Sequence, residues 1–160
     1  MLLVLTCLFV NCGGDQVVHH DHDHDEGNGH HHHHHEPPHG GVPIVLGDEE
    51  YHLEFLIDNE KGIMMMYVMD AHMENFVRIA SPEIVMKVTV GDKSADLKFI
   101  PQASNTTGES VGDTSLFIAE DEIIKELKEF EALIPEINIK TSTYSEVKFP
   151  FPEGNEPDEH

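Results

Sequence analysis

The sequence contains no tryptophan, only two cysteines and only nine basic residues among 160. Both cysteines, Cys7 and Cys12, lie in the first dozen residues, so the rest of the chain can hold no disulfide, cysteine nucleophile or cysteine metal site. Acidic residues number 31, and the resulting formal charge of −22 disfavours nucleic acid as a partner. The chain also lacks a Gly-x-Ser-x-Gly elbow, a Walker loop and a His-Glu-x-x-His pair, so we expect no enzyme.

The only long apolar run is Met1 to Val10, which is too short to span a bilayer as a helix. Its length fits the apolar core of an export signal, although the usual basic start is missing. The stretch from Leu8 to Cys12 resembles the lipobox of bacterial lipoproteins. That resemblance implies lipid attachment at Cys12 and a place in the bacterial cell envelope, at the outer membrane or its periplasmic face. The alternatives are an ordinary cleaved signal, which gives a secreted protein, or a mis-assigned start codon that truncates the basic start.

Residues 13–38 have a different composition. They contain six acidic residues, no Lys or Arg, and no apolar residues except Val17 and Val18, so we expect a disordered tether. Ten of the 14 histidines lie between positions 19 and 35, in an alternating His/Asp stretch and a run of six. These histidines are His19, His20, His22, His24, His30, His31, His32, His33, His34 and His35.

A His-rich segment of this kind is typical of metal binding. Imidazole is a common ligand for Zn, Cu, Ni and Co, and the interspersed carboxylates offset the charge of a cation. Protons compete for the same nitrogens, so affinity should fall as the pH drops through ~6.5. Two alternatives remain: the run of six is a purification tag, or the segment is a solvated spacer without a metal role.

The remaining sequence predicts an all-β domain. Tyr51 to Ile57 alternates with period two, which places His52 and Glu54 on the face opposite Tyr51 and Leu53. Short apolar runs separated by turn residues favour a single antiparallel β-sandwich of the Ig-like type. We expect strands at residues 42–46, 51–57, 63–69, 76–79, 84–90, 95–100, 115–118, 137–141 and 147–149.

One short helix is expected within this β pattern. Between Asp121 and Leu133, apolar residues recur at helical spacing, and Pro135 would end the helix. The last residues are acidic and expected to fray. The predicted organisation is a signal at 1–12, a tether at 13–38, a β-sandwich domain at 39–152 and an acidic tail at 153–160.

The start of the β domain resembles the small N-terminal β-domain of heavy-metal RND efflux periplasmic adaptor proteins, and related stand-alone His-rich bacterial lipoproteins. The resemblance covers about residues 37–90. It rests on Pro38-His39-Gly40-Gly41, Leu46-Gly47, Tyr51, Leu53-Glu54, Gly62 and Tyr67. It implies metal handling in the envelope rather than transport, because the further adaptor domains do not fit in 160 residues.

Four residues of the β domain are candidate metal ligands. His39 borders the tether and could complete a site with it, or could be an ordinary turn histidine. His52 and Glu54 share a strand face, but a solvated face is the simpler interpretation. His72 precedes Met73, and thioether with imidazole would suit Cu(I), whereas methionine more commonly fills an irregular core.

The sequence therefore predicts a lipid-anchored protein that binds divalent metal ions in the cell envelope, for buffering, detoxification or delivery. A metal efflux or uptake system is the expected partner. The alternative is a non-catalytic interaction module whose His-rich segment is a spacer, and a substrate-binding or enzymatic role ranks third.

Overall fold

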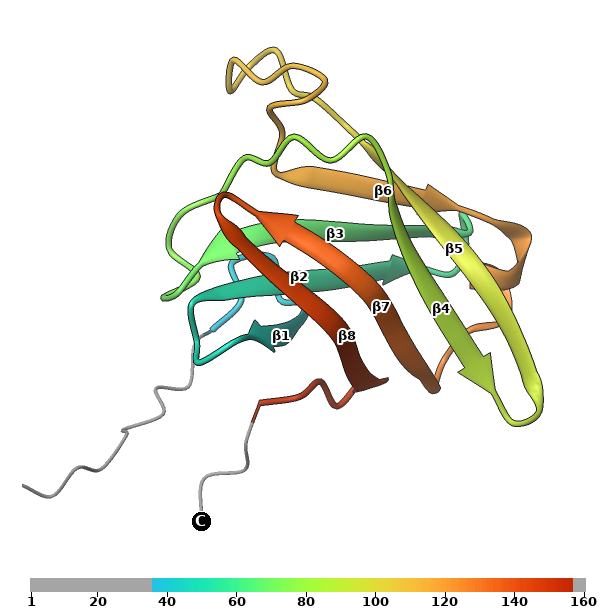
Figure 1. The fold of residues 1–160 in the computed structure, drawn as a ribbon. Helices are drawn as coiled ribbons and strands as arrows, with labels where there is room; N and C mark the ends of the chain where they lie inside the picture. The colour runs from blue at the N-terminus through green and yellow to red at the C-terminus, as the bar shows by residue number, and fades with distance from the viewer. Residues whose placement is uncertain (1–35, 157–160) are drawn as a thin grey trace, which may run out of the picture. The chain divides into compact units, whose positions relative to one another are not determined.

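The structure, a computed structural model, describes residues 36–156, and these form an antiparallel β fold (Figure 1). The expected signal at 1–12 and the tether up to residue 35 lie outside the described residues. The strands are β1 (Val42–Leu46), β2 (Tyr51–Asp58), β3 (Ile63–Asp70), β4 (Ile84–Val90), β5 (Lys93–Pro101), β6 (Leu116–Glu120), β7 (Phe130–Ile139) and β8 (Ser142–Phe151).

All eight strands belong to one sheet of order β1-β2-β3-β6-β5-β4-β7-β8, in which every pairing is antiparallel. Strand β5 turns the corner of this sheet, because Lys93 to Phe99 pair with β4, whereas Ile100 and Pro101 pair with β6. In Figure 1, β1, β2, β3 and β6 run across the view, while β4, β5, β7 and β8 run steeply through it. The sheet thus curls until it is nearly closed into a barrel, and the expected two-sheet sandwich is not confirmed.

Side chains bridge the seam between the two outermost strands, β1 and β8. The Asn155 side chain accepts a hydrogen bond from the Val45 N–H at 2.7 Å and donates one to the Val45 carbonyl at 3.1 Å. The Tyr144 hydroxyl on β8 donates to the Glu50 carboxylate just after β1. The expected fraying is therefore not seen at residues 153–156. The Asn155 side chain pairs with the N–H and carbonyl groups of Val45 on β1, as a neighbouring strand would.

The core fills the inside of the curled sheet with side chains from all eight strands. Phe55 lies near its centre, with its ring 5.8 Å from Phe99 and 5.3 Å from Phe149. Met64 and Met66 are fully buried in the same cluster, so both fill the core, which is the more common role of methionine.

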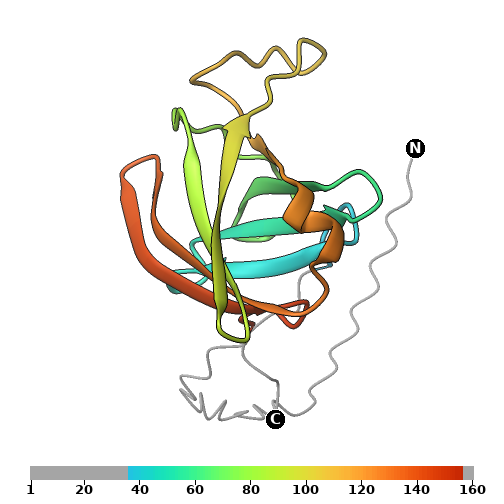
Figure 2. The same ribbon diagram turned by 90° about the vertical axis from the view of Figure 1, so that its right-hand side faces the viewer.

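The predicted helix at 121–133 is wrong beyond its first turn. Only a 3-10 helix, η1 (Glu122–Glu126), forms, and the Asp121 side chain caps it by accepting from the Ile123 N–H. From Phe130 onward the chain is β7, which pairs with both β4 and β8. Figure 2 shows η1 as a short orange coil, and it is the one helical element within residues 36–156. The strand expected at 76–79 is reduced to two isolated bridges, Met69 with Phe76 and Ile79 with Thr114.

Candidate functional site

The predicted site residues fall into two groups. Cys12 and the ten histidines of residues 19–35 lie outside the described residues, whereas His39, His52, Glu54 and His72 lie within them. Of these four, the structure brings His39 and Glu54 into direct contact. No group of three or more His, Cys, Asp or Glu side chains within residues 36–156 is arranged to hold a metal ion.

Glu54 is the centre of the candidate site. It lies on the outer face of β2 with an exposed fraction of 0%, so the expectation of a solvated face for His52 and Glu54 is wrong. Its Oε1 accepts hydrogen bonds from the backbone N–H groups of His39 at 2.8 Å and Gly41 at 3.0 Å. Its Oε2 lies 2.8 Å from Nδ1 of the His39 ring. A buried carboxylate is stable only with such partners, and all three come from the segment that enters the sheet.

The Pro-His-Gly-Gly sequence explains how that segment reaches Glu54. A turn closes with the Gly40 N–H donating to the Pro37 carbonyl at 3.0 Å, and Gly40 has a left-handed φ of +70°. Gly41 then lies so close to β2 that a Cβ on it would be 2.6 Å from the Phe55 carbonyl oxygen. Gly40 thus provides the backbone conformation, whereas Gly41 provides the space.

The His39 ring is fixed from a second direction. It stacks on Tyr67 with ring centroids 4.1 Å apart and an interplanar angle of 14°, and Phe76 lies 5.7 Å from it. Tyr67 is on β3 directly opposite Glu54 in the strand register. Burial, and then the negative charge of Glu54, raise the pKa of the Tyr67 hydroxyl above its ordinary value. The His39 side chain keeps an exposed fraction of 34%, so an oriented imidazole remains accessible to solvent.

The other two histidines do not join this pair in a metal site. His52 is 1% exposed and faces Met69 across the β2–β3 ladder, with its Nδ1 3.4 Å from the Asp70 carbonyl oxygen. His72 is exposed in the turn after β3, while the neighbouring Met73 is buried. Within residues 36–156, His39 is thus an oriented and accessible imidazole, but no complete ligand set accompanies it.

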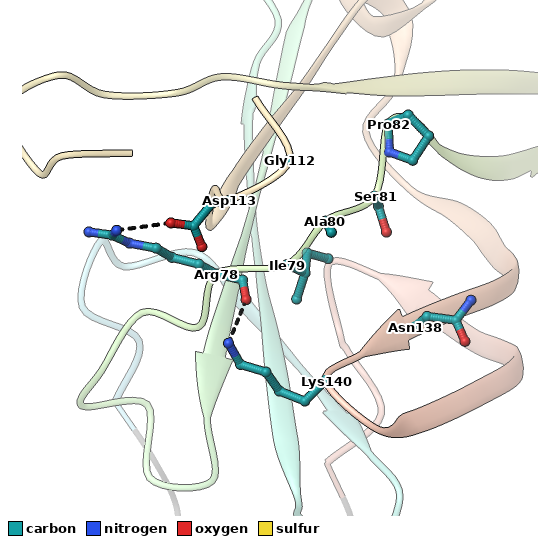
Figure 3. Close-up of a pocket in the computed structure, with 9 residues that line it drawn as sticks. All are labelled: Arg78, Ile79, Ala80, Ser81, Pro82, Gly112, Asp113, Asn138 and Lys140. Atoms are coloured by element: carbon teal, nitrogen blue, oxygen red, sulfur yellow. Dashed lines mark hydrogen bonds and ion pairs between the residues drawn. The ribbon is translucent and has the colours of Figure 1, made fainter. Parts of the chain in front are cut away.

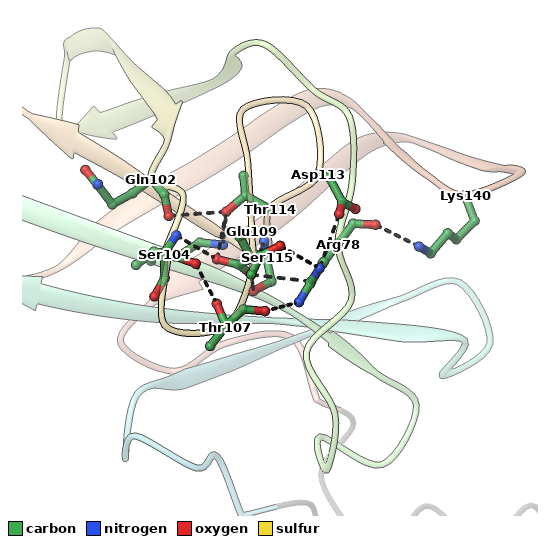
Figure 4. Close-up of polar contacts among 11 residues, drawn as sticks. Arg78, Gln102, Ser104, Thr107, Glu109, Asp113, Thr114, Ser115 and Lys140 are labelled. Atoms are coloured by element: carbon green, nitrogen blue, oxygen red, sulfur yellow. Dashed lines mark hydrogen bonds and ion pairs between the residues drawn. The ribbon is translucent and has the colours of Figure 1, made fainter.

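Sequence analysis missed a second polar cluster, centred on Glu109 (Figure 4). Its nearly buried carboxylate accepts hydrogen bonds from Ser115 Oγ at 2.7 Å, from Thr114 Oγ1 at 3.3 Å and from the N–H groups of Ser104 and Ser115. Burial alone would raise the pKa of Glu109, but these hydrogen bonds together lower it below its ordinary value. Nothing in the local sequence, a Ser/Thr/Gly-rich stretch, distinguishes this glutamate from the other acidic residues of the chain.

Arg78, the only arginine of the sequence, links this cluster to a shallow hollow of about 500 Å³ (Figure 3). Its guanidinium donates to the Thr107 and Gly108 carbonyls and lies 3.2 Å from the Asp113 carboxylate. Lys140, on the far side of the hollow, donates to the Arg78 carbonyl at 2.8 Å. The Arg78 guanidinium thus holds the loop at 102–115, whereas Lys140 holds the backbone at Arg78, and these contacts favour a structural role over ligand binding.

None of the described residues forms a helix with the length and hydropathy needed to cross a membrane. Among known proteins, no family model, no curated sequence and no solved structure matches this chain.

Proposed function

We propose that the protein is an exported, lipid-anchored and non-catalytic protein that binds divalent Zn, Cu, Ni or Co in the bacterial cell envelope. The observation that carries the proposal is the position of the His39 ring, held on Glu54 at 2.8 Å only four residues after the last histidine of the His-rich segment. The ten imidazoles of residues 19–35 are thereby continuous in sequence with one that the sheet holds in place. The resemblance to the N-terminal domain of metal efflux adaptors supports the same role.

The His-rich segment carries most of the metal in this proposal. Its ten imidazoles and neighbouring carboxylates bind several ions per chain, with an order of affinity that follows the Irving–Williams series. Calorimetric titration of the full chain with Zn²⁺, Ni²⁺ and Cu²⁺ tests this. We expect several ions per chain at neutral pH, and affinity that falls steeply below pH ~6.5. Replacing the ten histidines by alanine should remove most of the binding, and unchanged stoichiometry would refute the proposal.

The physiological role has its own test. A strain that produces the protein without residues 19–35 is compared with a strain in which the whole gene is deleted. Under excess Zn, Cu, Ni or Co, both strains should lose growth to the same extent. The alternative function, an interaction module with a spacer, predicts normal metal tolerance in the first strain. That alternative is favoured by Phe76, a large apolar side chain that is 48% exposed beside His39 and Tyr67.

Lipid attachment is tested separately. Labelled palmitate should be incorporated into the full chain and into Cys7→Ser, but not into Cys12→Ser. Incorporation that depends on Cys7 instead, or no incorporation in any variant, would refute lipid attachment at Cys12. Neither result would bear on metal binding, which the calorimetric titration tests.

A further inference from the structure

The outer face of the sheet is apolar where β2, β3 and β6 lie side by side (Figure 1). Strand β3 shows this most plainly, because every residue from Ile63 to Met69 is apolar or aromatic. Met64 and Met66 belong to the core, so alternation along the strand places Met65 and Tyr67 on the opposite, outer face. A continuously apolar strand is typical of one that is covered on both faces.

The strand register sets six outer side chains into two rows across the sheet. One row contains Leu56, Met65, Ile118 and Ile100, and the next contains Tyr67 and Leu116. All six lie outside the core cluster; five are partly exposed, and Ile100 is 49% exposed. These six residues are called the outer apolar face. Phe76, which is 48% exposed, extends this face beside Tyr67.

We propose that the outer apolar face is a docking surface for an amphipathic helix of another protein, one that carries basic residues beside its apolar stripe. The proposal goes beyond metal binding and does not depend on it. An apolar patch of this kind on a protein surface is typical of an interaction site, and methionine within it adapts its shape to a partner.

The dimensions of the face suit a helix. Neighbouring strands lie about 4.8 Å apart, so the row of four side chains is about 14 Å long. Three turns of helix are about 16 Å long, and apolar residues at i, i+4 and i+7 form one stripe along them. A helix laid along the row therefore brings its stripe over all four side chains, in the way that helices cover sheets within domains.

The charges around the face favour a basic partner. Glu120 is exposed on the same face of β6 as Ile118, and no lysine or arginine of residues 36–156 forms an ion pair with it. Lys61 lines the same hollow as Glu120, but it is already paired with Asp58 at 2.7 Å. The formal charge of −22 makes two copies of the chain repel each other and opposes approach to an anionic lipid surface. A helix with lysine or arginine beside its stripe is attracted instead.

Ile100→Glu separates apolar docking from attraction between charges. Half of the side chain is exposed, so we expect an unchanged fold and thermal melt. The added negative charge would tighten the binding of a basic peptide that charge alone holds, but it would weaken binding that buries Ile100. Val111→Glu is the matched control, because it adds the same charge at a side chain that is 77% exposed in the loop at 102–115, outside the outer apolar face.

The probe is a fluorescein-labelled leucine/lysine peptide of about 14 residues with its leucines at helical spacing. Its fluorescence anisotropy is titrated with the full chain at about 0.15 M salt. Ile100→Glu and Phe76→Glu should each weaken binding by roughly 10–100-fold, whereas Val111→Glu should change it by less than about twofold. Glu120→Gln should weaken binding slightly and make it less sensitive to salt.

Binding that is as tight or tighter in Ile100→Glu and Phe76→Glu overturns the proposal, because charge alone then holds the peptide. Equal binding of a scrambled leucine/lysine peptide, or of a leucine/glutamate peptide with the same spacing, overturns it as well, and so does the absence of binding. Metal titrations are unaffected by any of these results, so the proposed function stands or fails separately.

The other possible occupants of the face have their own signatures. A dimer in sedimentation that Ile100→Glu dissociates would assign the face to a second copy of the chain. Flotation with phosphatidylcholine vesicles that Ile100→Glu abolishes would assign it to a lipid surface. Binding of the leucine/lysine peptide only after residues 13–35 are deleted would assign it to the chain's own N-terminal segment. Each of these results overturns the proposal.

Discussion

Residues 37–41 lead into β1 and are called the entry segment here. Its two glycines test how this segment reaches Glu54, because an added methyl group would have different neighbours at each position. At Gly41, a Cβ would lie 2.6 Å from the Phe55 carbonyl oxygen and 2.8 Å from Glu54 Cγ. At Gly40, a Cβ would meet nothing within 4 Å, but the φ of +70° is strained for any residue with a side chain. Gly41→Ala therefore tests whether the close approach to β2 leaves room for a side chain, and Gly40→Ala tests the need for a left-handed backbone conformation.

The expected magnitudes differ accordingly. Gly40→Ala should lower the free energy of unfolding by about 1 kcal/mol, since left-handed strain is partly offset by a less flexible unfolded chain. In Gly41→Ala the close neighbour is backbone of β2 and cannot move aside, so the entry segment must shift outward. Overpacking of this kind costs about 1–3 kcal/mol, and loss of the hydrogen bond to the carboxylate about 1.5–3 kcal/mol. We expect a total loss of about 3–5 kcal/mol.

Urea unfolding, followed by tyrosine emission, measures both variants. The slowly exchanging ¹H resonance of the His39 backbone amide, which donates to Glu54 Oε1, reports whether the segment is still docked. Gly41→Ala should lose that resonance, whereas Gly40→Ala should keep it. Gly40→Asn is a useful third variant, since asparagine tolerates the left-handed region better than alanine does. If Gly41→Ala is no less stable than Gly40→Ala and retains the His39 resonance, the close approach of Gly41 to β2 does not position the site.

Three further predictions concern the seam and the second polar cluster. Asn155→Ala should lower stability by about 1–3 kcal/mol and raise hydrogen exchange at the Val45 amide, and an equally protected amide would refute the bridging role. Burial, and then a hydrogen bond to a carboxylate, raise the pKa of Tyr144 from 10.0 to about 12. Its contribution to stability is therefore complete below pH 10 and lost as the pH rises towards 12, so Tyr144→Phe should flatten the alkaline part of the stability profile. The pKa of Glu109 is lowered, so its contribution is lost as the pH falls through the folded value. Glu109→Gln should reduce that acid dependence and speed proteolysis of the loop at 102–115; unchanged proteolysis would show that Glu109 does not hold the loop.

The period of two over Tyr51 to Ile57 predicted the strand correctly, and β2 runs from Tyr51 to Asp58. The same pattern failed to predict the site, because alternation shows that a strand has two faces but not what covers each of them. The inner face of β2 packs into the core, and the outer face at Glu54 is covered by an entry segment that binds it through backbone N–H groups. Burial of the carboxylate thus depends on contacts 13 and 15 residues away in sequence, which no periodicity reports.

The helix expected at 121–133 failed for a related reason. Ile123, Ile124, Leu127 and Phe130 fit helical spacing, but so short an apolar pattern does not separate a helix from a turn followed by a strand. The ladder with β8 gives every residue of β7 except Pro135 a partner on the neighbouring strand. Tertiary pairing therefore outweighed the local preference, and only the capped turn at Glu122–Glu126 remains helical.

The bridge from Asn155 to Val45 joins residues 110 positions apart, and this has a consequence for biosynthesis. Strand β1 precedes the other strands in the chain, but it obtains its outer hydrogen-bond partner only after residue 155 has been synthesised. Strand β3 likewise has no second neighbouring strand until β6 has been synthesised. A nascent chain that carries only the first strands therefore has bare edges and no stable core. We therefore expect the domain to fold only after β8 and Asn155 have been synthesised, as a single late step rather than strand by strand.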